Sequence, residues 1–222
     1  MTSSSDKISR REEINELFEQ IGQVLEERIE ALLIGGAVML ELGLKDATKD
    51  IDVVCRSEKD KETLLGAVKA LGFHMVGPEK RHERLGVNRL AVKGGRNLDI
   101  FAERISYDFS LSDAMWQRAV RSMSFGSLTV RNASVEDIFI MKLIAARPGD
   151  APDCLALVSV GLDFDVIYEE IASQYLKDSE QSNQKIWITY IEEGIARLED
   201  NGLTIPISDK ISLLAFEYHE KL

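Results

Sequence analysis

The sequence predicts an α+β protein in which a mixed β-sheet core with flanking helices precedes an all-α C-terminal domain. Two observations lead to this prediction. As far as about Val130, short apolar runs typical of strands alternate with amphipathic stretches of helical period, and beyond it only helical periodicity remains. We therefore expect a core domain, with an N-terminal helix, at residues 1–130 and a helical domain at residues 131–222.

The composition is that of a packed globular protein. Of the 222 residues 45% are hydrophobic and only 4 are proline. The two cysteines, Cys55 and Cys154, each lie in an apolar run, so we expect buried free thiols in a reducing compartment. No apolar run is long enough to span a membrane and the first residues lack the apolar segment of a signal peptide. A cytoplasmic location without membrane contact is therefore expected.

The charge is unevenly distributed. The net charge of -11 argues against a broadly basic surface for nucleic acids. Residues 150–222 hold 15 acidic and 5 basic residues, so the acidity is mostly in the C-terminal third. Residues 79–104 hold 7 basic and 4 acidic residues, and this stretch is either a phosphate-facing surface or an ordinary solvated one.

The first elements follow from periodicity. Apolar residues recur at helical spacing over 10–29, which predicts an amphipathic helix. The apolar run 31–34 then predicts a strand, Gly35-Gly36 a turn, residues 37–44 a short helix, and the run ending in 53–55 a second strand.

The middle of the chain alternates further. Ser57, with Asp60 three residues on, forms a capping box that opens a helix over 59–71. Strands are expected at 73–76, 88–92 and 98–102, with a glycine hairpin turn at 93–97, and a strand pair at 122–130 turning at Gly126. A helix is expected at 108–120, a second capping box at Ser134 opens a helix to Ala146, and further helices are expected at 153–160, 164–176, 185–199 and 208–221.

The chemistry centres on Asp50 and Asp52. Alternate residues of a strand point to the same face, so the two carboxylates are expected side by side. Gly35-Gly36 has no side chains to hinder close approach and opens a helix, whose free N–H groups favour a phosphate. Carboxylates beside phosphates are the ligands that Mg²⁺ prefers. The alternative interpretation is a pair of acidic residues in a solvated loop.

Asp99 is the candidate third carboxylate. It lies inside the apolar run 97–101, where an acid is unfavourable unless it is paired or ligated. The alternative places it at a strand end in solvent. Sequence signatures of P-loops, dinucleotide-binding folds, CxxC sites and zinc proteases are absent.

These motifs together resemble a known family. Leu33 to Ala37, Thr48 to Val53 and the later Asp99 are similar to the nucleotidyltransferase superfamily with the DNA polymerase β fold. Their residues resemble its minimal prokaryotic branch, which includes the AbiEii-like toxins. The resemblance continues through 136–147 to Asp150 and Asp153, and covers roughly residues 30–160.

The resemblance implies roles for individual residues. Asp50, Asp52 and Asp99 would bind the metal and act in catalysis, Asp99 alternatively taking the proton of the acceptor hydroxyl. Nucleotide-binding residues would be Gly35, Gly36, Lys49 and Lys142. An acceptor or base site would include Arg147, Asp150 and Asp153. Ala37 stands where many members have Ser, so one hydroxyl contact to phosphate is missing.

Three of these residues have plainer interpretations. Lys142 is alternatively on the solvent face of its helix, and Arg147 alternatively interacts with the negative C-terminal end of that helix. Asp153 is alternatively a helix N-cap.

The resulting hypothesis is an enzyme that uses Mg²⁺ (or Mn²⁺) and transfers NMP from an NTP to an acceptor hydroxyl. The resemblance admits tRNA, a protein or a small molecule as acceptor, and also a toxin whose partner is a cognate antitoxin. The acidic C-terminal domain tilts this towards a small or basic acceptor. One alternative is a non-catalytic protein of the same fold that binds a nucleotide or a partner. Another is a sugar-phosphate or small-molecule binder, favoured if Asp99 lies far from Asp50 and Asp52.

Overall fold

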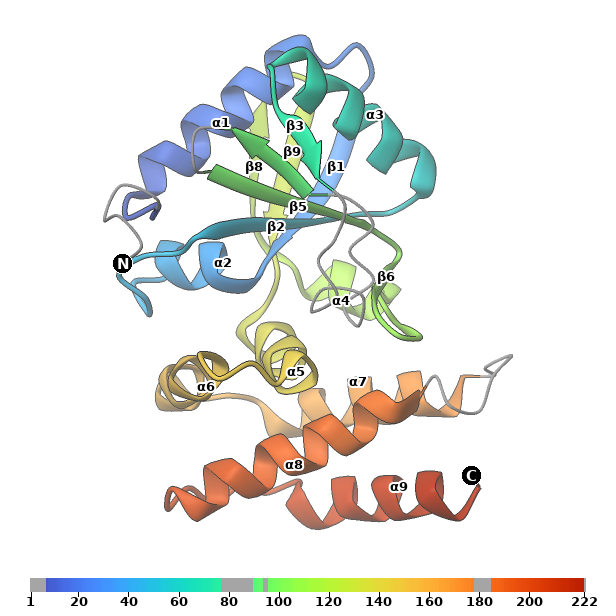
Figure 1. Cartoon of the computed structure of the whole chain (residues 1–222). Coiled ribbons are helices and arrows are strands. Elements are labelled where there is room, and N and C mark those ends of the chain that lie inside the picture. The colour runs from blue at the N-terminus through green and yellow to red at the C-terminus, as the bar shows by residue number, and fades with distance from the viewer. Residues whose placement is uncertain (1–6, 77–89, 94–95, 178–184, 222) are drawn as a thin grey trace.

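The structure is a computed structural model that describes residues 7–76, 90–93, 96–177 and 185–221. Figure 1 shows a β-sheet with helices on its outer face and a group of helices below it. None of the helices within the described ranges is long and apolar enough to cross a membrane.

Within the described residues, seven strands form one mixed sheet in the order β3-β4-β5-β2-β1-β9-β8. The central β2 runs antiparallel to β1 and parallel to β5, while β1 runs parallel to β9. The strands are β1 (Ile29–Ile34), β2 (Asp50–Cys55), β3 (His74–Val76), β4 (Leu90–Lys93), β5 (Arg96–Ala102), β8 (Val120–Phe125) and β9 (Leu128–Asn132). The predicted mixed-sheet core is therefore confirmed.

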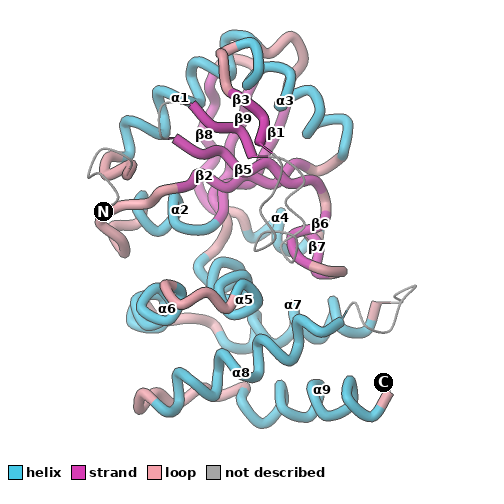
Figure 2. The backbone as a smooth tube through the Cα atoms, in the orientation of Figure 1, coloured by secondary structure: helices cyan, strands magenta, loops and turns pink. Residues whose placement is uncertain are grey.

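Two helices cover the outer face of the sheet, α1 (Arg11–Val24) and α3 (Glu58–Ala70), as the helix and strand colours of Figure 2 show. The predicted cap of α3 is present, because Ser57 Oγ accepts a hydrogen bond of 3.1 Å from the Asp60 amide. The helix predicted over 10–29 is longer than the one observed, α1. The chain leaves α1 after Val24 and enters β1 at Ile29, whose side chain joins the core.

The helical group lies below the sheet in Figure 1. It consists of α5 (Val135–Ala145), α6 (Asp150–Ser159), α7 (Phe164–Leu176), α8 (Trp187–Asp200) and α9 (Ser208–Glu220). The expected helical C-terminal region is thus confirmed, and β9 ends at Asn132, just before it. The position of a domain boundary stays a prediction.

Helix α5 joins the two layers. Its residues 137–144 are all buried, so it is enclosed by protein on all sides. It packs on α2 (Gly35–Glu41) towards the sheet and on α6, α7 and α8 below. Its predicted cap is present, with Ser134 Oγ accepting from the Asp137 amide at 3.2 Å. A side chain on α5 therefore faces either the core or the other helices.

A buried charge network fastens α5 to its neighbours. Arg118 donates to Asp137 at 2.6 Å and to Glu170 of α7 at 2.7 Å. Both carboxylates are almost fully buried. Such a network is stable only with all partners present, so it fixes how α4 (Asp113–Arg118), α5 and α7 meet.

The helix expected at 108–120 is wrong in its first part. Residues 104–110 form a small hairpin of β6 (Arg104–Ser106) and β7 (Phe109–Ser110). Tyr107 adopts a positive φ of 53° in its turn, which a helix does not allow. Helix α4 begins only after Ser112, whose Oγ caps the Met115 amide at 3.0 Å.

Further expectations fall partly outside the described residues. Asn88 and Arg89 of the strand expected at 88–92 lie outside them, as do Gly94 and Gly95 of the hairpin turn. The strands on either side of this turn pair antiparallel, with Lys93 opposite Arg96, as expected of a hairpin. Most of the basic cluster within 79–104 is also outside the described residues.

Gly22 sets how closely α1 approaches the sheet. A Cβ added at Gly22 would lie 1.5 Å from the backbone oxygen of Phe125, at the turn between β8 and β9. The same turn is held by the Ser127 amide, which donates to Gly22 O at 3.1 Å.

We expect Gly22→Ala to destabilise the protein by about 1–3 kcal/mol or more, because backbone must move to admit the methyl group. Gly66→Ala, on the exposed side of α3 where nothing lies within 4 Å, is the matched control. It should stabilise the protein by about 0.5–1 kcal/mol through helix propensity. Urea unfolding of both variants measures this, and equal effects would contradict the close packing of α1 on this turn.

Candidate active site

The three aspartates singled out in the sequence meet at the centre of the sheet. Asp50 and Asp52 are the first and third residues of β2, and Asp52 is paired in register with Asp99 on β5. Asp52 is half-buried and Asp99 is only 8% exposed. The alternatives of a solvated loop pair and of a solvent-exposed strand end are therefore wrong. Asp99 lies beside Asp52, which also removes the ground for the sugar-phosphate alternative.

Gly35 and Gly36 lie so close to β2 and the residues before it that a side chain would not fit at either position. Gly35 is the first residue of α2 and adopts a positive φ of 68°. A Cβ there would lie 2.8 Å from Asp52 Oδ2. A Cβ at Gly36 would lie 2.6 Å from Oγ1 of Thr48, which donates to the Asp50 carbonyl at 3.0 Å. The pair thus lets the start of α2 lie against β2, and the first N–H groups of any α-helix have no partner within that helix.

The surroundings of Asp52 and Asp99 disfavour the ionised form of both carboxyl groups. Burial, together with the neighbouring Asp50, raises the pKa of Asp52 to about 6, although Arg147 opposes the rise. Burial and the charges of Asp52 and Asp50 raise the pKa of Asp99 to about 8. In the protein alone, Asp99 therefore holds a proton at neutral pH. A site in this state gains stability from any cation that lets its carboxylates ionise.

The donor set suits a hard divalent cation. Oδ1 of Asp99 is buried and has no hydrogen-bond partner among the described residues. Asp50 Oδ1 accepts a hydrogen bond of 2.8 Å from the side-chain nitrogen Nδ2 of Asn97. Within the part of the chain that the structure describes, no group of three or more His, Cys, Asp or Glu side chains is arranged to hold a metal. The residues therefore fit an ion held by one or two carboxylates and completed by substrate phosphates, as is usual for Mg²⁺.

A second set of charges joins α5 and α6 to the loop before β2. Lys142 of α5 donates to Asp150 at 2.8 Å and to Asp153 at 2.6 Å. Lys45, from the α2–β2 loop, donates to the same Asp153 at 2.7 Å. We call Lys45, Lys142, Arg147, Asp150 and Asp153 the ion cluster.

The ion cluster corrects two interpretations. Lys142 is only 5% exposed, so it is not on a solvent face. Asp153 is not an N-cap, because α6 begins at Asp150 with Gly149 as its cap. The two acidic neighbours raise the pKa of Lys142 against the opposing effect of burial, so the ammonium stays charged. Its role as a phosphate ligand stays a prediction, as do acceptor roles for Asp150 and Asp153.

Arg147 links the ion cluster to the aspartates. It follows the end of α5, and both its amide and its Nε donate to Asp150 Oδ2, at 2.9 and 3.1 Å. Its charge also acts on Asp52, Asp50 and Asp99. Arg147 therefore interacts with Asp150 and the three aspartates, and not only with the C-terminal end of α5 as in the plainer interpretation. Lys49, by contrast, is exposed in the turn before β2, and its predicted nucleotide contact stays a prediction.

Sequence reasoning missed Lys45 and Thr48. Lys45 stands in no recognisable motif, and Thr48 begins the stretch Thr48 to Val53 without a role predicted for its hydroxyl. Their one sequence signal is position, since both lie between the glycine pair and Asp50.

A pocket opens beside Asp52, between the sheet and α5. Its polar end is formed by Gly35, Asp52, Lys142 and Arg147. The rest of its wall is apolar and consists of Ile34, Phe101, Ile105, Ile138, Met141 and Ala145. The two ends match a ligand with a charged and an apolar part, and the volume of about 50 Å³ admits only a small portion of such a ligand.

Most of the chain matches a known protein family. The sequence model of a family described as "Nucleotidyltransferase of unknown function (DUF6036)" matches residues 12–194. None of the curated proteins matches the chain. The branch that contains the AbiEii-like toxins stays a prediction.

Solved structures show a related fold. The crystal structure of ANT(2")-Ia in complex with adenylyl-2"-tobramycin superposes with a TM-score of 0.50 at 19% identity, covering 73% of this chain and 97% of that one. The solution structure of the antibiotic-resistance factor ANT(2'')-Ia gives 0.50 at 18%, covering 74% and 92%. An antigenic nucleotidyltransferase-like protein from Paracoccidioides brasiliensis gives 0.41 at 14%, covering 79% and 91%. At these identities the likeness concerns the fold alone.

Asp99 should make stability depend on pH. The pKa of its carboxyl is about 8 in the folded protein and about 4 in the unfolded chain. The stabilisation it gives is complete below pH ~4 and is lost as the pH rises through about 8. We therefore expect metal-free Asp99→Asn to gain stability relative to the wild type between pH 5 and 8.5, on the order of 1–3 kcal/mol.

Urea unfolding at the two pH values measures this difference. The control is Asp46→Asn, an exposed residue of the loop before β2, whose effect should be small at both. If the stability difference between Asp99→Asn and wild type did not change with pH, the pKa of Asp99 would not be raised by its surroundings.

Lys142→Met should destabilise the protein by about 3 kcal/mol, because it leaves two buried carboxylates with fewer cations. Lys45 and Arg147 remain as partners of Asp153 and Asp150, which places the loss at the lower end of the range for buried pairs. Lys69→Met, exposed on α3, is the control and should change little. An unchanged unfolding free energy for Lys142→Met would contradict a structural role of the ion cluster.

Proposed function

The chain belongs to this family of nucleotidyltransferases, and from that premise we propose that it transfers NMP from an NTP to an acceptor hydroxyl with the help of Mg²⁺ or Mn²⁺. The observation that carries the proposal is the pairing of Asp52 with Asp99 against Gly35. This pairing brings two carboxylates to the first turn of α2. One of their oxygens, Oδ1 of Asp99, is buried and has no hydrogen-bond partner among the described residues.

Asp52 would hold the divalent cation together with one of its neighbours Asp50 and Asp99, and the substrate phosphates would complete its ligands. When bound, such an ion neutralises the triphosphate and lowers the pKa of the attacking hydroxyl. Gly35 and Gly36 would hold the phosphates through the backbone N–H groups at the start of α2. The apolar wall of the pocket would accept the base, while Arg147 and Lys142 stand at its charged end.

The transfer needs a group that takes the proton of the acceptor hydroxyl. Asp99 is the candidate when Asp50 is the second metal ligand, because its carboxylate then lies beside Asp52 on the neighbouring strand and is free to accept the proton. The O–H bond of the acceptor breaks as its oxygen bonds to the α-phosphorus. The bond from that phosphorus to the β-phosphate oxygen breaks, and pyrophosphate leaves.

The proposal so far does not specify the class of acceptor. The ANT(2")-Ia crystal contains adenylyl-2"-tobramycin, an adenylylated small molecule, which supports a small-molecule acceptor for this chain. Nothing comparable supports tRNA, a protein acceptor or a cognate antitoxin. The alternative is a non-catalytic nucleotide-binding protein. The presence of all three aspartates on the paired strands argues against it.

The test measures nucleotide binding and transfer together. We expect calorimetry to show binding of ATP that requires Mg²⁺, and labelled ATP to transfer its NMP to an acceptor. Asp52→Asn and Asp99→Asn should each reduce the transfer rate at least ~100-fold, the usual scale for losing a metal ligand or a general base.

Asp46→Asn is the matched control, since it removes an exposed carboxylate from the neighbouring loop and should keep full activity. Retained transfer in Asp52→Asn would exclude the proposed site. Mg²⁺-dependent binding of ATP without transfer to any acceptor would favour the non-catalytic alternative.

A further inference from the structure

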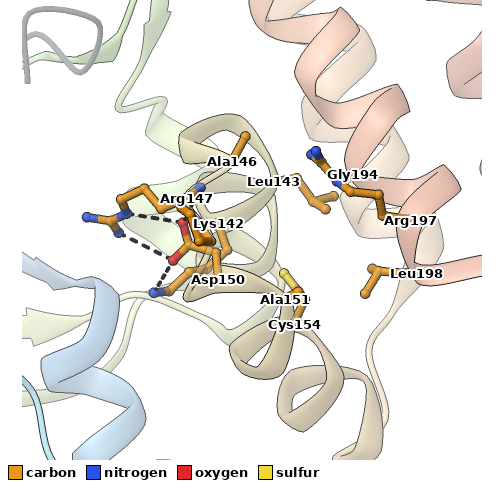
Figure 3. A pocket seen from close by; sticks show the side chains of 11 residues that line it. Lys142, Leu143, Ala146, Arg147, Asp150, Ala151, Cys154, Gly194, Arg197 and Leu198 are labelled. Carbon is orange, nitrogen blue, oxygen red and sulfur yellow. Dashed lines mark hydrogen bonds and ion pairs between the residues drawn. The ribbon is translucent and has the colours of Figure 1, made fainter. Parts of the chain in front are cut away.

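A second pocket lies on the other side of the α5–α6 turn (Figure 3). It opens between α5, this turn and α8, and its volume is about 250 Å³. A water molecule takes about 30 Å³ of liquid, so the pocket has room for a phosphate or sugar group. Its apolar walls are formed by Leu143, Ala146, Pro148, Ala151, Cys154 and Leu198.

The charged groups of this pocket are mostly cationic. Lys142, Arg147 and Arg197 line it together with one carboxylate, Asp150. That carboxylate is already engaged, because it accepts from both Lys142 and Arg147. Lys142 is also paired with Asp153, so of the three cations only Arg197 has no carboxylate partner among the described residues.

Arg197 is the cation of this pocket that the described part of the chain leaves without a protein partner. Figure 3 shows its side chain extending from α8 towards α5, whereas Arg147 points away from α8 on the far side of the turn. Its side chain is exposed, and among the described residues its guanidinium makes no hydrogen bond or ion pair. A guanidinium at the edge of an apolar pocket is suited to bidentate binding of a phosphate or carboxylate.

The acidic residues of α8 are directed elsewhere. Glu192, Glu193 and Glu199 line a different hollow, together with residues of α9. These three glutamates therefore lie on another side of α8 and do not line this pocket.

The second pocket adjoins the catalytic one. Lys142 and Arg147 line both, and the first pocket contains Asp52. A substrate seated in the second pocket reaches Asp52 past Lys142 and Arg147, the two residues that the pockets share.

We propose that this pocket binds a phosphate group of the acceptor through Arg197 while the acceptor hydroxyl faces Asp52 and Asp99. This rests on the proposed function and adds the class of acceptor. The acceptor is an anion, either a free phosphorylated sugar or the 3′ end of an RNA, and not a polycationic aminoglycoside.

The test uses ribose 5-phosphate, ribose, the trinucleotide CCA and tobramycin as probes. Each is titrated by calorimetry into the full chain saturated with Mg²⁺ and a non-hydrolysable ATP analogue. We expect ribose 5-phosphate or the trinucleotide to bind, and ribose and tobramycin not to bind. Preference between the first two identifies the source of the phosphate. Arg197→Gln should weaken this binding by about tenfold or more, the scale of one charged hydrogen-bond pair.

Arg28→Gln is the matched control, since Arg28 is exposed before β1 and should leave the affinity unchanged. The proposal is overturned if neither phosphate probe binds, if Arg197→Gln binds as tightly as wild type, or if tobramycin binds instead. Failure of the ATP analogue to bind counts against the proposed function. In that case Arg197-dependent binding of ribose 5-phosphate to the nucleotide-free protein still supports the phosphate site.

Discussion

The register of β2 between β1 and β5 is the constraint on which the site depends. It places Asp52 opposite both Ile34, the residue before Gly35, and Asp99. Because successive side chains of a strand alternate, a shift of one residue would turn Asp52 into the opposite face and bring Ile51 or Val53 beside Asp99. The apolar residues on either side of the aspartates are fully buried, so the core itself fixes this register.

The ion cluster adds the second half of the site. The sheet alone provides the carboxylates and glycines, but the pockets also need α5 and the α5–α6 turn at a defined place. Lys142 and Asp153 connect these helices, and Lys45 ties them to the loop that carries Thr48 and leads to Asp50. Both of the pockets beside the turn therefore use residues whose positions are set by buried charge pairs.

The sequence predicted the strands and most helices because their apolar periods and caps are local. Glycine and aspartate spacing likewise predicted that Asp50, Asp52 and Asp99 belong together, and their proximity is confirmed. The hairpin at 104–110 was missed, since its turn depends on a positive φ at Tyr107, which periodicity does not reveal. Lys45 and Arg197 were also missed, because each gains its meaning from a neighbour more than forty residues away in the chain.

The most direct measurement of the central claim is a crystal structure of the protein with Mg²⁺ and a non-hydrolysable ATP analogue. We expect phosphates against Gly35 and Gly36, the ion between them and Asp52 with Asp50 or Asp99, and the base on the apolar wall formed by Phe101 and Met141. A nucleotide bound elsewhere, or an ion that contacts neither Asp52 nor Asp99, would contradict this claim.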